Sequence, residues 1–301
     1  MVMEGMKPSL KTYSTLMVAF GNCSDTETVM GLLKEMEHLG LRPDTYTFTI
    51  CIRVLGRAGK INEAYDVFKR MEKEGCEPNV ITYTVLIGAL CEAGNVDEAF
   101  HTLDVMKKKG ISPNLLTYNT LIGGLSRESR LNEALKLFNK MKSSNVMPNA
   151  VTHSFLISGL AKFNGVDEAI DFYYDHVGRD FSPVPHMYGP LIDGLCKLGR
   201  HEEAMLLFEE MAEYGCKPNI VIFNILINGF GKIGDVELRV NCLKNGMVEQ
   251  AVVVYEELQS KGFEPNVSTY NALIRTYSLS GNPDRAYAIY EKMIVEGCNP
   301  E

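Results

Sequence analysis

The 301-residue sequence contains no tryptophan and no Cys-x-x-Cys pair. It also has no run of about 18 apolar residues, so no membrane span is expected. Without Cys-x-x-Cys, zinc ribbons, thioredoxin-like redox motifs and zinc deaminases are disfavoured. We expect the eight cysteines to be free thiols in a reducing compartment. Because the histidines share no repeating position, we predict neither a metal site nor a cofactor; they are His38, His101, His153, His176, His186 and His201.

The sequence instead carries a 35-residue repeat, which is clearest at residues 80–114. This unit holds two helical patterns, and Gly94 breaks the first because glycine allows the turn that stops a helix. The second opens on Asp97 and Glu98, whose charges suit a helix N-terminus, and Gly110 ends it. The unit is therefore predicted to be a helical hairpin that cannot bury its apolar faces alone.

We number the positions of this unit as slots 1 to 35. Slot 34 is proline at nine places, which are Pro8, Pro43, Pro78, Pro113, Pro148, Pro183, Pro218, Pro265 and Pro300. In this register a tail of a truncated repeat (1–9) precedes eight repeats, at 10–44, 45–79, 80–114, 115–149, 150–184, 185–219, 220–266 and 267–301. Stacked hairpins share one continuous core, so a single all-α solenoid is predicted for residues 10–301.

The repeat at 220–266 is 12 residues longer than the others. Gly234 and Gly246 both fit the turn between its helices, and residues 239–246 resemble the end of another first helix. The extra residues are either an inserted functional loop or the result of fusing two partial repeats.

Three tracts, LLTYNTLIGGL, INEAYDVFKRMEKEGCEPN and HEEAMLLFEEMAEYGCKPN, resemble the pentatricopeptide repeat family, and the resemblance covers almost the whole chain. Apart from the 12 extra residues of the repeat at 220–266, all repeats are of the plain 35-residue kind. The resemblance implies a right-handed α-solenoid, or superhelix, of about eight helix-turn-helix hairpins whose first helices line the concave side. Family members are organellar proteins that bind single-stranded RNA and read one base per repeat. This implies chloroplast localisation, with the mitochondrion as the alternative, although no transit peptide is visible in this chain.

In this family slots 5 and 35 read the base. Here they are mostly small and polar: Ser14, Thr49, Thr84, Asn119, Ser154, Asn224 and Asn271 at slot 5, with Asp44, Asn79, Asn114, Asn149, Asn219 and Asn266 at slot 35. Gly189, Val184 and Glu301 depart from the pattern. Helix N-capping also explains slot 35, but it does not explain slot 5. We expect both rows to line an inner trough rather than to be buried between hairpins. The family's pairing implies a readout of 5′-G-A-A-Y-n-n-Y-n-3′.

Two further slots are implied to contact RNA. Slot 2 wedges apolar side chains between bases, here Tyr46, Ile81, Leu116, Val151 and Val221. Slot 13 contacts phosphate, here Arg57, Arg127, Lys162, Lys197 and Lys232, although cations near a helix C-terminus are also favoured by the helix dipole. The net charge is −8, but slots 1–14 hold eight basic and three acidic residues, a net +5. An acidic protein can thus present a basic groove.

The leading hypothesis is a single-stranded RNA binder that acts by occupancy in organellar RNA stabilisation, processing or translation control. It needs no small-molecule substrate, and its partners would be RNA and organellar RNA-processing or translation proteins. One alternative is a protein-binding scaffold of tetratricopeptide type, although that family has a 34-residue period with a tryptophan signature. Another is a truncated copy with little activity. An RNA enzyme would need an appended catalytic part, and all residues are accounted for by repeats.

Overall fold

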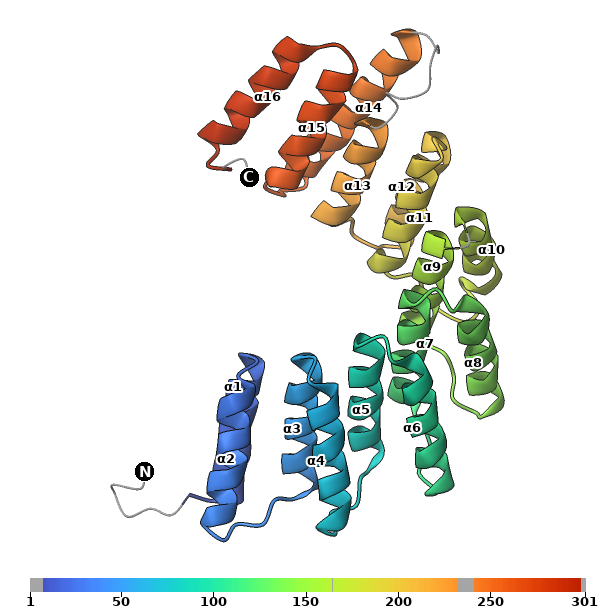
Figure 1. Ribbon diagram of the computed structural model, residues 1–301. Helices are drawn as coiled ribbons and strands as arrows, with labels where there is room; N and C mark the ends of the chain where they lie inside the picture. Colours follow the sequence, from blue (N-terminus) through green and yellow to red (C-terminus); the bar gives the residue numbers. More distant parts are fainter. Residues whose placement is uncertain (1–7, 164, 232–240, 299–301) are drawn as a thin grey trace. The chain divides into compact units, whose positions relative to one another are not determined.

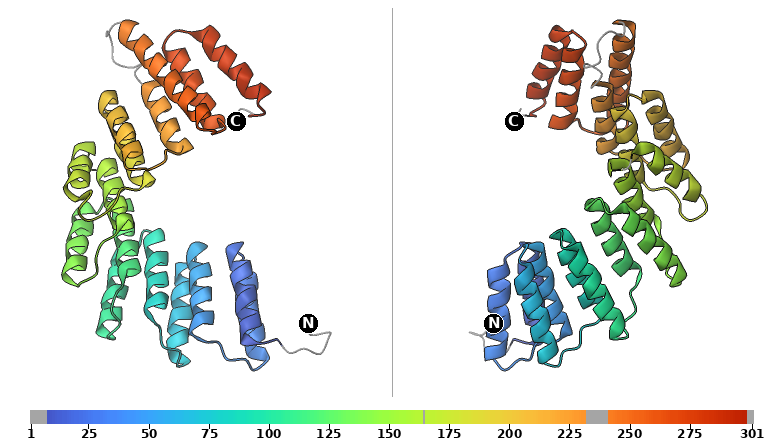
Figure 2. Two further views of the ribbon diagram at one scale, coloured as in Figure 1. Left: turned by 180° about the vertical axis from the view of Figure 1, so that it is seen from behind. Right: turned by 45° about the vertical axis from the view of Figure 1, so that its right-hand side comes forward.

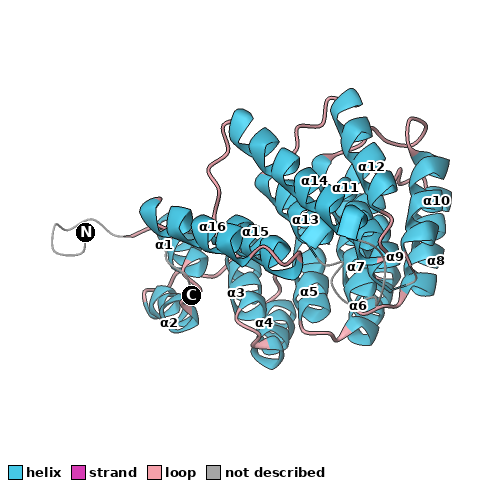
Figure 3. Cartoon of the chain, turned by 90° about the horizontal axis from the view of Figure 1, so that it is seen from above, coloured by secondary structure: helices cyan, strands magenta, loops and turns pink. Residues whose placement is uncertain are grey.

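The computed structural model describes residues 8–163, 165–231 and 241–298, and it leaves the side chains of residues 241–247 undescribed. Within these ranges the chain forms sixteen α-helices and no β-strand (Figures 1 and 3). The first helices of the repeats are α1 (Leu10–Asn22), α3 (Thr45–Arg57), α5 (Val80–Glu92), α7 (Leu115–Arg127), α9 (Ala150–Phe163), α11 (Pro185–Lys197), α13 (Ile220–Gly231) and α15 (Val267–Leu279). The second helices are α2 (Thr26–His38), α4 (Ile61–Lys73), α6 (Val96–Lys108), α8 (Leu131–Ser143), α10 (Val166–His176), α12 (His201–Glu213), α14 (Asn241–Ser260) and α16 (Pro283–Val295).

Local sequence explains the limits of each hairpin. Asn79 caps α5, and its side-chain oxygen accepts hydrogen bonds from the backbone N–H groups of Ile81 and Thr82 at 2.9 and 3.1 Å. Gly94 and Gly110 stand at φ +76°, in the left-handed region that terminates α5 and α6. All eight first helices therefore begin at the first residue of a predicted repeat.

The chain divides into two compact units, residues 1–155 and 156–301, and the boundary falls within α9. In the first unit the first helices α1, α3, α5 and α7 pack on one another in chain order, as do α11, α13 and α15 in the second. Five second helices (α2, α4, α6, α12 and α14) pack both against the first helix of their own repeat and against the first helix of the next. Figure 2 shows these pairs from two further sides. The single solenoid expected for residues 10–301 remains a prediction.

The core of each unit is made by two regular sets of side chains. Slot 4 supplies aromatic rings such as Phe48, Tyr83 and Tyr118, which are at most 1 % exposed. Slot 27 supplies methionines that are fully buried (Met36, Met71, Met106, Met141, Met211 and Met293). Burying one such side chain stabilises the fold by about 1.5–3 kcal/mol. A single hairpin cannot complete these contacts, so stacking is what stabilises the repeats.

Neighbouring first helices approach closely at slots 10 and 12. A Cβ on Gly56 would overlap the Cβ of Ala89, and one on Gly124 would lie 2.6 Å from the Sγ of Cys91. One residue of each facing pair is therefore small. These contacts bring consecutive first helices within reach of each other's polar side chains.

The seventh repeat corrects one expectation. Gly246 lies inside α14, not in a turn, and α14 is 20 residues long. The physical reason is the apolar face that follows, because Val248, Ala251 and Val254 are buried at helical spacing and hold the helix against its neighbours. One glycine costs a helix only about 1 kcal/mol, which this packing outweighs. Gly234 lies outside the described residues, as do residues 239 and 240.

In the described ranges, no helix combines the length and the apolar character that crossing a membrane requires.

Candidate functional site

The slot-35 side chains are held by the helix that follows them. The Oδ1 atom of Asp44 accepts a hydrogen bond from the Thr47 N–H at 2.8 Å, and Asn149 Oδ1 accepts one from the Thr152 N–H at 3.1 Å. Asn114, Asn219 and Asn266 make the same contact. The N-capping role considered from the sequence is therefore real. The cap fixes one oxygen of the slot-35 side chain at the helix end. The NH₂ group of an asparagine at this slot, or the second oxygen of Asp44, is therefore directed away from the helix end.

The slot-5 side chains are less accessible than the expected trough requires. Ser14, Thr49, Thr84, Asn119 and Ser154 are only 4–6 % exposed. The expectation that this row is not buried between hairpins is wrong for these residues. Over Ser14, Thr49 and Thr84 the reason is the first helix of the next repeat, which packs against their own helix. Asn224 is half-buried and Asn271 is exposed.

Ser14 and Thr49 each line a cavity, and the two cavities have a common construction. The Ser14 pocket, of about 490 Å³, is lined by Ser14 and Asp44 together with the slot-2 residues Lys11 and Tyr46. The Thr49 pocket, of about 420 Å³, is lined by Thr49 and Asn79 together with the slot-2 residues Tyr46 and Ile81. In both, slots 5 and 35 of one repeat meet slot 2 of that repeat and of the next. Both volumes fall in the range of about 300–1,000 Å³ that is usual for small-ligand sites.

Five slot-2 side chains are apolar yet exposed. Exposed fractions are 55 % for Tyr46, 53 % for Ile81, 61 % for Leu116, 40 % for Val151 and 58 % for Val221. Single exposed apolar residues are ordinary, but one at the same slot of five repeats is not explained by chance. Nor does core packing explain them, so they are available to contact a flat apolar ligand.

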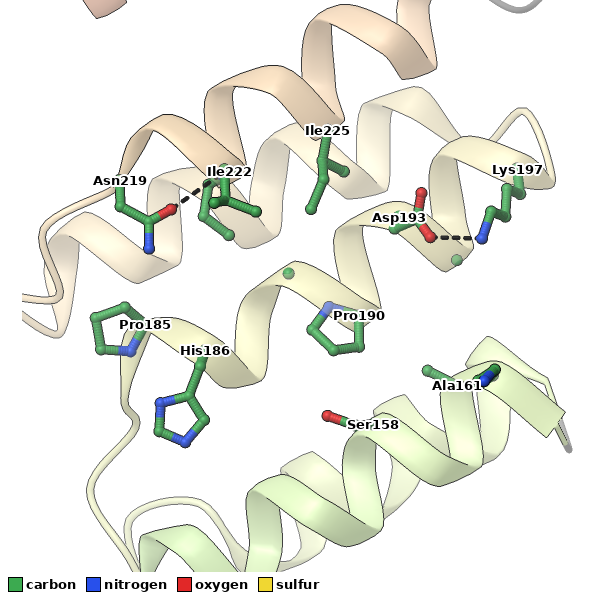
Figure 4. Close-up of a pocket in the computed structure, with 14 residues that line it drawn as sticks. Ser158, Ala161, Pro185, His186, Pro190, Asp193, Lys197, Asn219, Ile222 and Ile225 are labelled. Atoms are coloured by element: carbon green, nitrogen blue, oxygen red, sulfur yellow. Dashed lines mark hydrogen bonds and ion pairs between the residues drawn. The ribbon is translucent and has the colours of Figure 1, made fainter. Parts of the chain in front are cut away.

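The Gly189 pocket, of about 740 Å³, has the same plan in the second unit (Figure 4). Gly189 occupies slot 5, Asn219 slot 35, and the slot-2 residues His186 and Val221 lie on either side. Figure 4 shows Asn219 with its oxygen turned to the N–H of Ile222, at 3.1 Å. Because Gly189 has no side chain, nothing from slot 5 fills this pocket.

Cations lie beside these pockets. Arg53 lines the Thr49 pocket, and Arg53 and Arg57 together line a smaller cavity of about 220 Å³ that reaches Thr84 and Leu116. Lys162 and Lys197 line the Gly189 pocket, where Lys197 pairs with Asp193 at 2.5 Å. Arg127 is exposed, whereas Lys232 lies outside the described residues.

Cations on the second helices and in the loops are engaged differently. Arg130 donates to Asp97 and to Glu133 at 2.7 Å each, which raises its pKa, and Lys109 pairs with Glu72. Among the described residues Arg53 and Arg57 form no ion pair with the protein. Beside the Thr49 pocket the positive charge of Arg53 and Arg57 is thus left for an external anion, whereas that of Arg130 and Lys109 is satisfied within the protein.

Two contributors to the site were missed by sequence reasoning. Arg53 stands at slot 9, where arginine recurs only at Arg275, so no periodic signal marked it. The second is threonine at slot 3, which contacts slots 5 and 35 of the preceding repeat, as in the 2.8 Å contact of Thr82 with Thr49. Its recurrence could have been found in the sequence, because slot 3 is threonine in six repeats.

Comparison with known proteins agrees with this architecture. Models described as PPR repeat family (residues 85–127, 113–162 and 185–237), pentatricopeptide repeat domain (31–92 and 253–301) and PPR repeat (11–41, 151–175 and 241–263) match the chain. Together they leave only 1–10, 176–184 and 238–240 unmatched. No curated protein sequence matches.

Among solved structures, the pentatricopeptide repeat protein PPR10 from maize is 27 % identical with a TM-score of 0.60, over 99 % of this chain and 46 % of PPR10. A structure of PPR10 in complex with an 18-nt psaJ RNA element is 24 % identical with a TM-score of 0.52, over 99 % of this chain and 50 % of that one. PRORP2, the nuclear proteinaceous RNase P 2 from A. thaliana, shares the fold at 14 % identity, with a TM-score of 0.50, over 63 % of this chain and 43 % of PRORP2. The chain spans about half the length of PPR10.

Hairpins stacked in register, with pockets of one plan at Ser14, Thr49 and Gly189, define a helical-repeat protein of the α-solenoid class. The chain belongs to the pentatricopeptide repeat family.

Proposed function

We propose that the protein binds single-stranded RNA with sequence selectivity, one base per repeat. The observation that carries this proposal is the construction shared by the Ser14 and Thr49 pockets, in which two exposed slot-2 side chains flank a polar edge. A base that enters such a pocket lies between the slot-2 side chains and presents its Watson–Crick edge to slots 5 and 35. The PPR10 complex with RNA supports this assignment.

The capping geometry gives slot 35 a defined chemistry. Asp44 uses Oδ1 for the cap, and its second oxygen accepts hydrogen bonds from the N1–H and NH₂ donors of guanine. Asn114 uses Oδ1 in the same way, and its NH₂ group donates to the N1 acceptor of adenine. These directions agree with guanine at the first repeat and adenine at the third.

Affinity and selectivity come from different slots in this proposal. Stacking of a base on a side chain contributes about 1–3 kcal/mol and is tolerant of sequence. A good pair of base-edge contacts adds about 1–3 kcal/mol of discrimination. Four readable repeats then select the tetranucleotide G-A-A-Y, and binding by this chain is weak and sensitive to salt.

The cellular role follows from occupancy without a catalytic step. A bound repeat array blocks nucleases or keeps a translation start unpaired, which fits organellar RNA stabilisation, processing or translation control. We assign the protein to the chloroplast, with the mitochondrion as the alternative.

A titration of fluorescent single-stranded RNA decides between the hypotheses. We expect G-A-A-C and G-A-A-U to bind more tightly than scrambled strands of the same composition at moderate salt. Equal affinity for all strands removes sequence reading. Affinity for none of them refutes RNA binding and favours a protein-binding scaffold or a copy with little activity.

A further inference from the structure

Threonine at slot 3 is a buried bridge between neighbouring repeats. Thr47, Thr82, Thr117, Thr152 and Thr269 are all fully buried. Each hydroxyl lies within hydrogen-bond distance of the slot-5 side chain and the slot-35 side chain of the preceding repeat. Buried hydroxyl groups need partners, and here both partners are side chains that the proposed function assigns to the base.

The contact is complete at the fourth repeat, and the seventh has the same set between Asn224, Asn266 and Thr269. Thr152 Oγ1 donates to Asn119 Oδ1 at 2.7 Å, and Asn119 Nδ2 donates to Asn149 Oδ1 at 3.2 Å. Asn149 Oδ1 also accepts from the Thr152 N–H at 3.1 Å. The oxygens of both carboxamides are thereby turned toward Thr152. The NH₂ group of Asn149 is left on the opposite side of its carboxamide, so a donor rather than an acceptor meets the base.

In the part of the chain that the structure describes, the Thr152 hydroxyl is the one donor to Asn119 Oδ1, and its removal leaves that oxygen without this hydrogen bond. The two orientations of the Asn119 carboxamide, with oxygen or with nitrogen toward Asn149, then come closer in energy. In one orientation of Asn119 the pair offers the base a hydrogen-bond donor, and in the other orientation it offers an acceptor. Cytosine has an acceptor at N3 where uracil has an N–H donor, so a pair that samples both orientations cannot discriminate between them.

The distribution of this threonine follows the distribution of family-like pairs. Slot 3 holds Met187 after the pair Ser154 and Val184, and Ile222 after the pair Gly189 and Asn219. Three pairs depart from the family's pattern, and these are the two that a further repeat follows. Slot 3 is thus threonine after pairs that fit the family's pattern and is not threonine after these two pairs that depart from it.

We propose that the slot-3 threonine is a positioning residue that fixes which hydrogen-bonding groups of the preceding repeat face the base. The inference rests on the proposed RNA binding and assigns part of its selectivity to a residue that the base does not touch.

The test compares Thr152→Val with Thr152→Ser in the full chain. Affinities are measured for four strands that differ only at the fourth base of G-A-A-N. We expect Thr152→Val to lower discrimination at that base about two- to tenfold, the effect of one hydrogen bond. Thr152→Ser should restore it, and preferences at the first three bases should not change. A control, Thr102→Val, removes a hydroxyl that is 2 % exposed and donates to the Glu98 carbonyl on a second helix. It should leave all four preferences unchanged.

Outcomes separate the two proposals. If the wild-type protein binds no RNA, the proposed function fails. If it selects the fourth base and Thr152→Val selects it equally well, the positioning role alone is refuted. A uniform loss of affinity without a change in preference also refutes it, because that is the result of a purely structural threonine.

A gain of function keeps the inference testable if Thr152→Val does not fold. In the Gly189 pocket a Cβ on Gly189 would lie 3.5 Å from Ile222 Cδ1, an ordinary contact, so an asparagine can be placed there. We expect Gly189→Asn with Ile222→Thr to discriminate at the sixth base about two- to tenfold more strongly than Gly189→Asn alone. Equal discrimination by the single and double variants overturns the proposal.

Discussion

Removing one cation beside the pockets should change how RNA binding responds to salt. Arg57 is exposed, lies beside the cavity that reaches Thr84, and forms no ion pair within the described part of the chain. If it contacts a phosphate, Arg57→Ala prevents the release of one counterion on binding. The slope of log K against log salt concentration then falls by about 0.7 for a single strand.

That change is large enough to measure. Between 50 and 200 mM salt the wild-type protein should lose about 2.6-fold more affinity than Arg57→Ala, because the salt concentration changes fourfold. Adding Arg53→Ala should raise this difference to about sevenfold. The assay is the fluorescence titration repeated at four or five salt concentrations, with G-A-A-C RNA as the ligand.

Arg130 provides a control of equal charge. Its guanidinium is already bonded to Asp97 and Glu133, both at 2.7 Å, on the layer of second helices. Arg130→Ala should therefore leave the salt slope unchanged. A fall in slope as large as that of Arg57→Ala would show that only net charge matters, and an unchanged slope for Arg57→Ala would remove its phosphate contact.

Two further predictions test the pockets and the stacking. Thr84→Asn combined with Asn114→Asp should move the preferred third base from adenine to uracil, because the slot-35 side chain then offers an acceptor in place of a donor. Competition among the four strands that differ at that base checks this, and an unchanged preference refutes the slot assignment. Gly56→Ala should destabilise the protein by about 1–3 kcal/mol in urea unfolding, because its Cβ would overlap Ala89. The matched change is Gly31→Ala, at a helical glycine whose added Cβ would have nothing within 4 Å. It should instead stabilise the protein by roughly 0.5–1 kcal/mol. If Gly31→Ala destabilised the protein more than Gly56→Ala, the close-packing argument would be refuted.

The helix boundaries could be predicted because they depend on local chemistry. Asn79 caps α5, Gly94 and Gly110 adopt positive φ, and Asp97 and Glu98 lie in the first turn of α6. Each of these effects acts within a few residues of sequence, so the repeated pattern places the start of every first helix correctly.

Accessibility could not be predicted, because it depends on the neighbouring repeat. Thr49 is a small polar residue on a helix, and only the packing of α5 over it leaves it 4 % exposed. Gly246 fitted a turn locally, but the apolar face of α14 that continues beyond it favours a helix. Arg53 belongs to the site because of where its own repeat meets the next one, and no periodic signal encodes that.

The stacking contacts and the pockets are parts of one arrangement. The overlap that a Cβ at Gly56 would produce shows that α3 and α5 approach as closely as their backbones allow at slots 10 and 12. That approach places the Thr82 hydroxyl 2.8 Å from Thr49 and brings Ile81 beside Tyr46 in a single pocket. A larger side chain in place of Gly56 would push α5 outward. The side chains of Thr49, Thr82, Tyr46 and Ile81 would then move apart, although the new side chain contacts none of them. Selectivity for the base at this repeat should therefore decline with Gly56→Ala, while the preference at the fourth base, two interfaces away, should be retained.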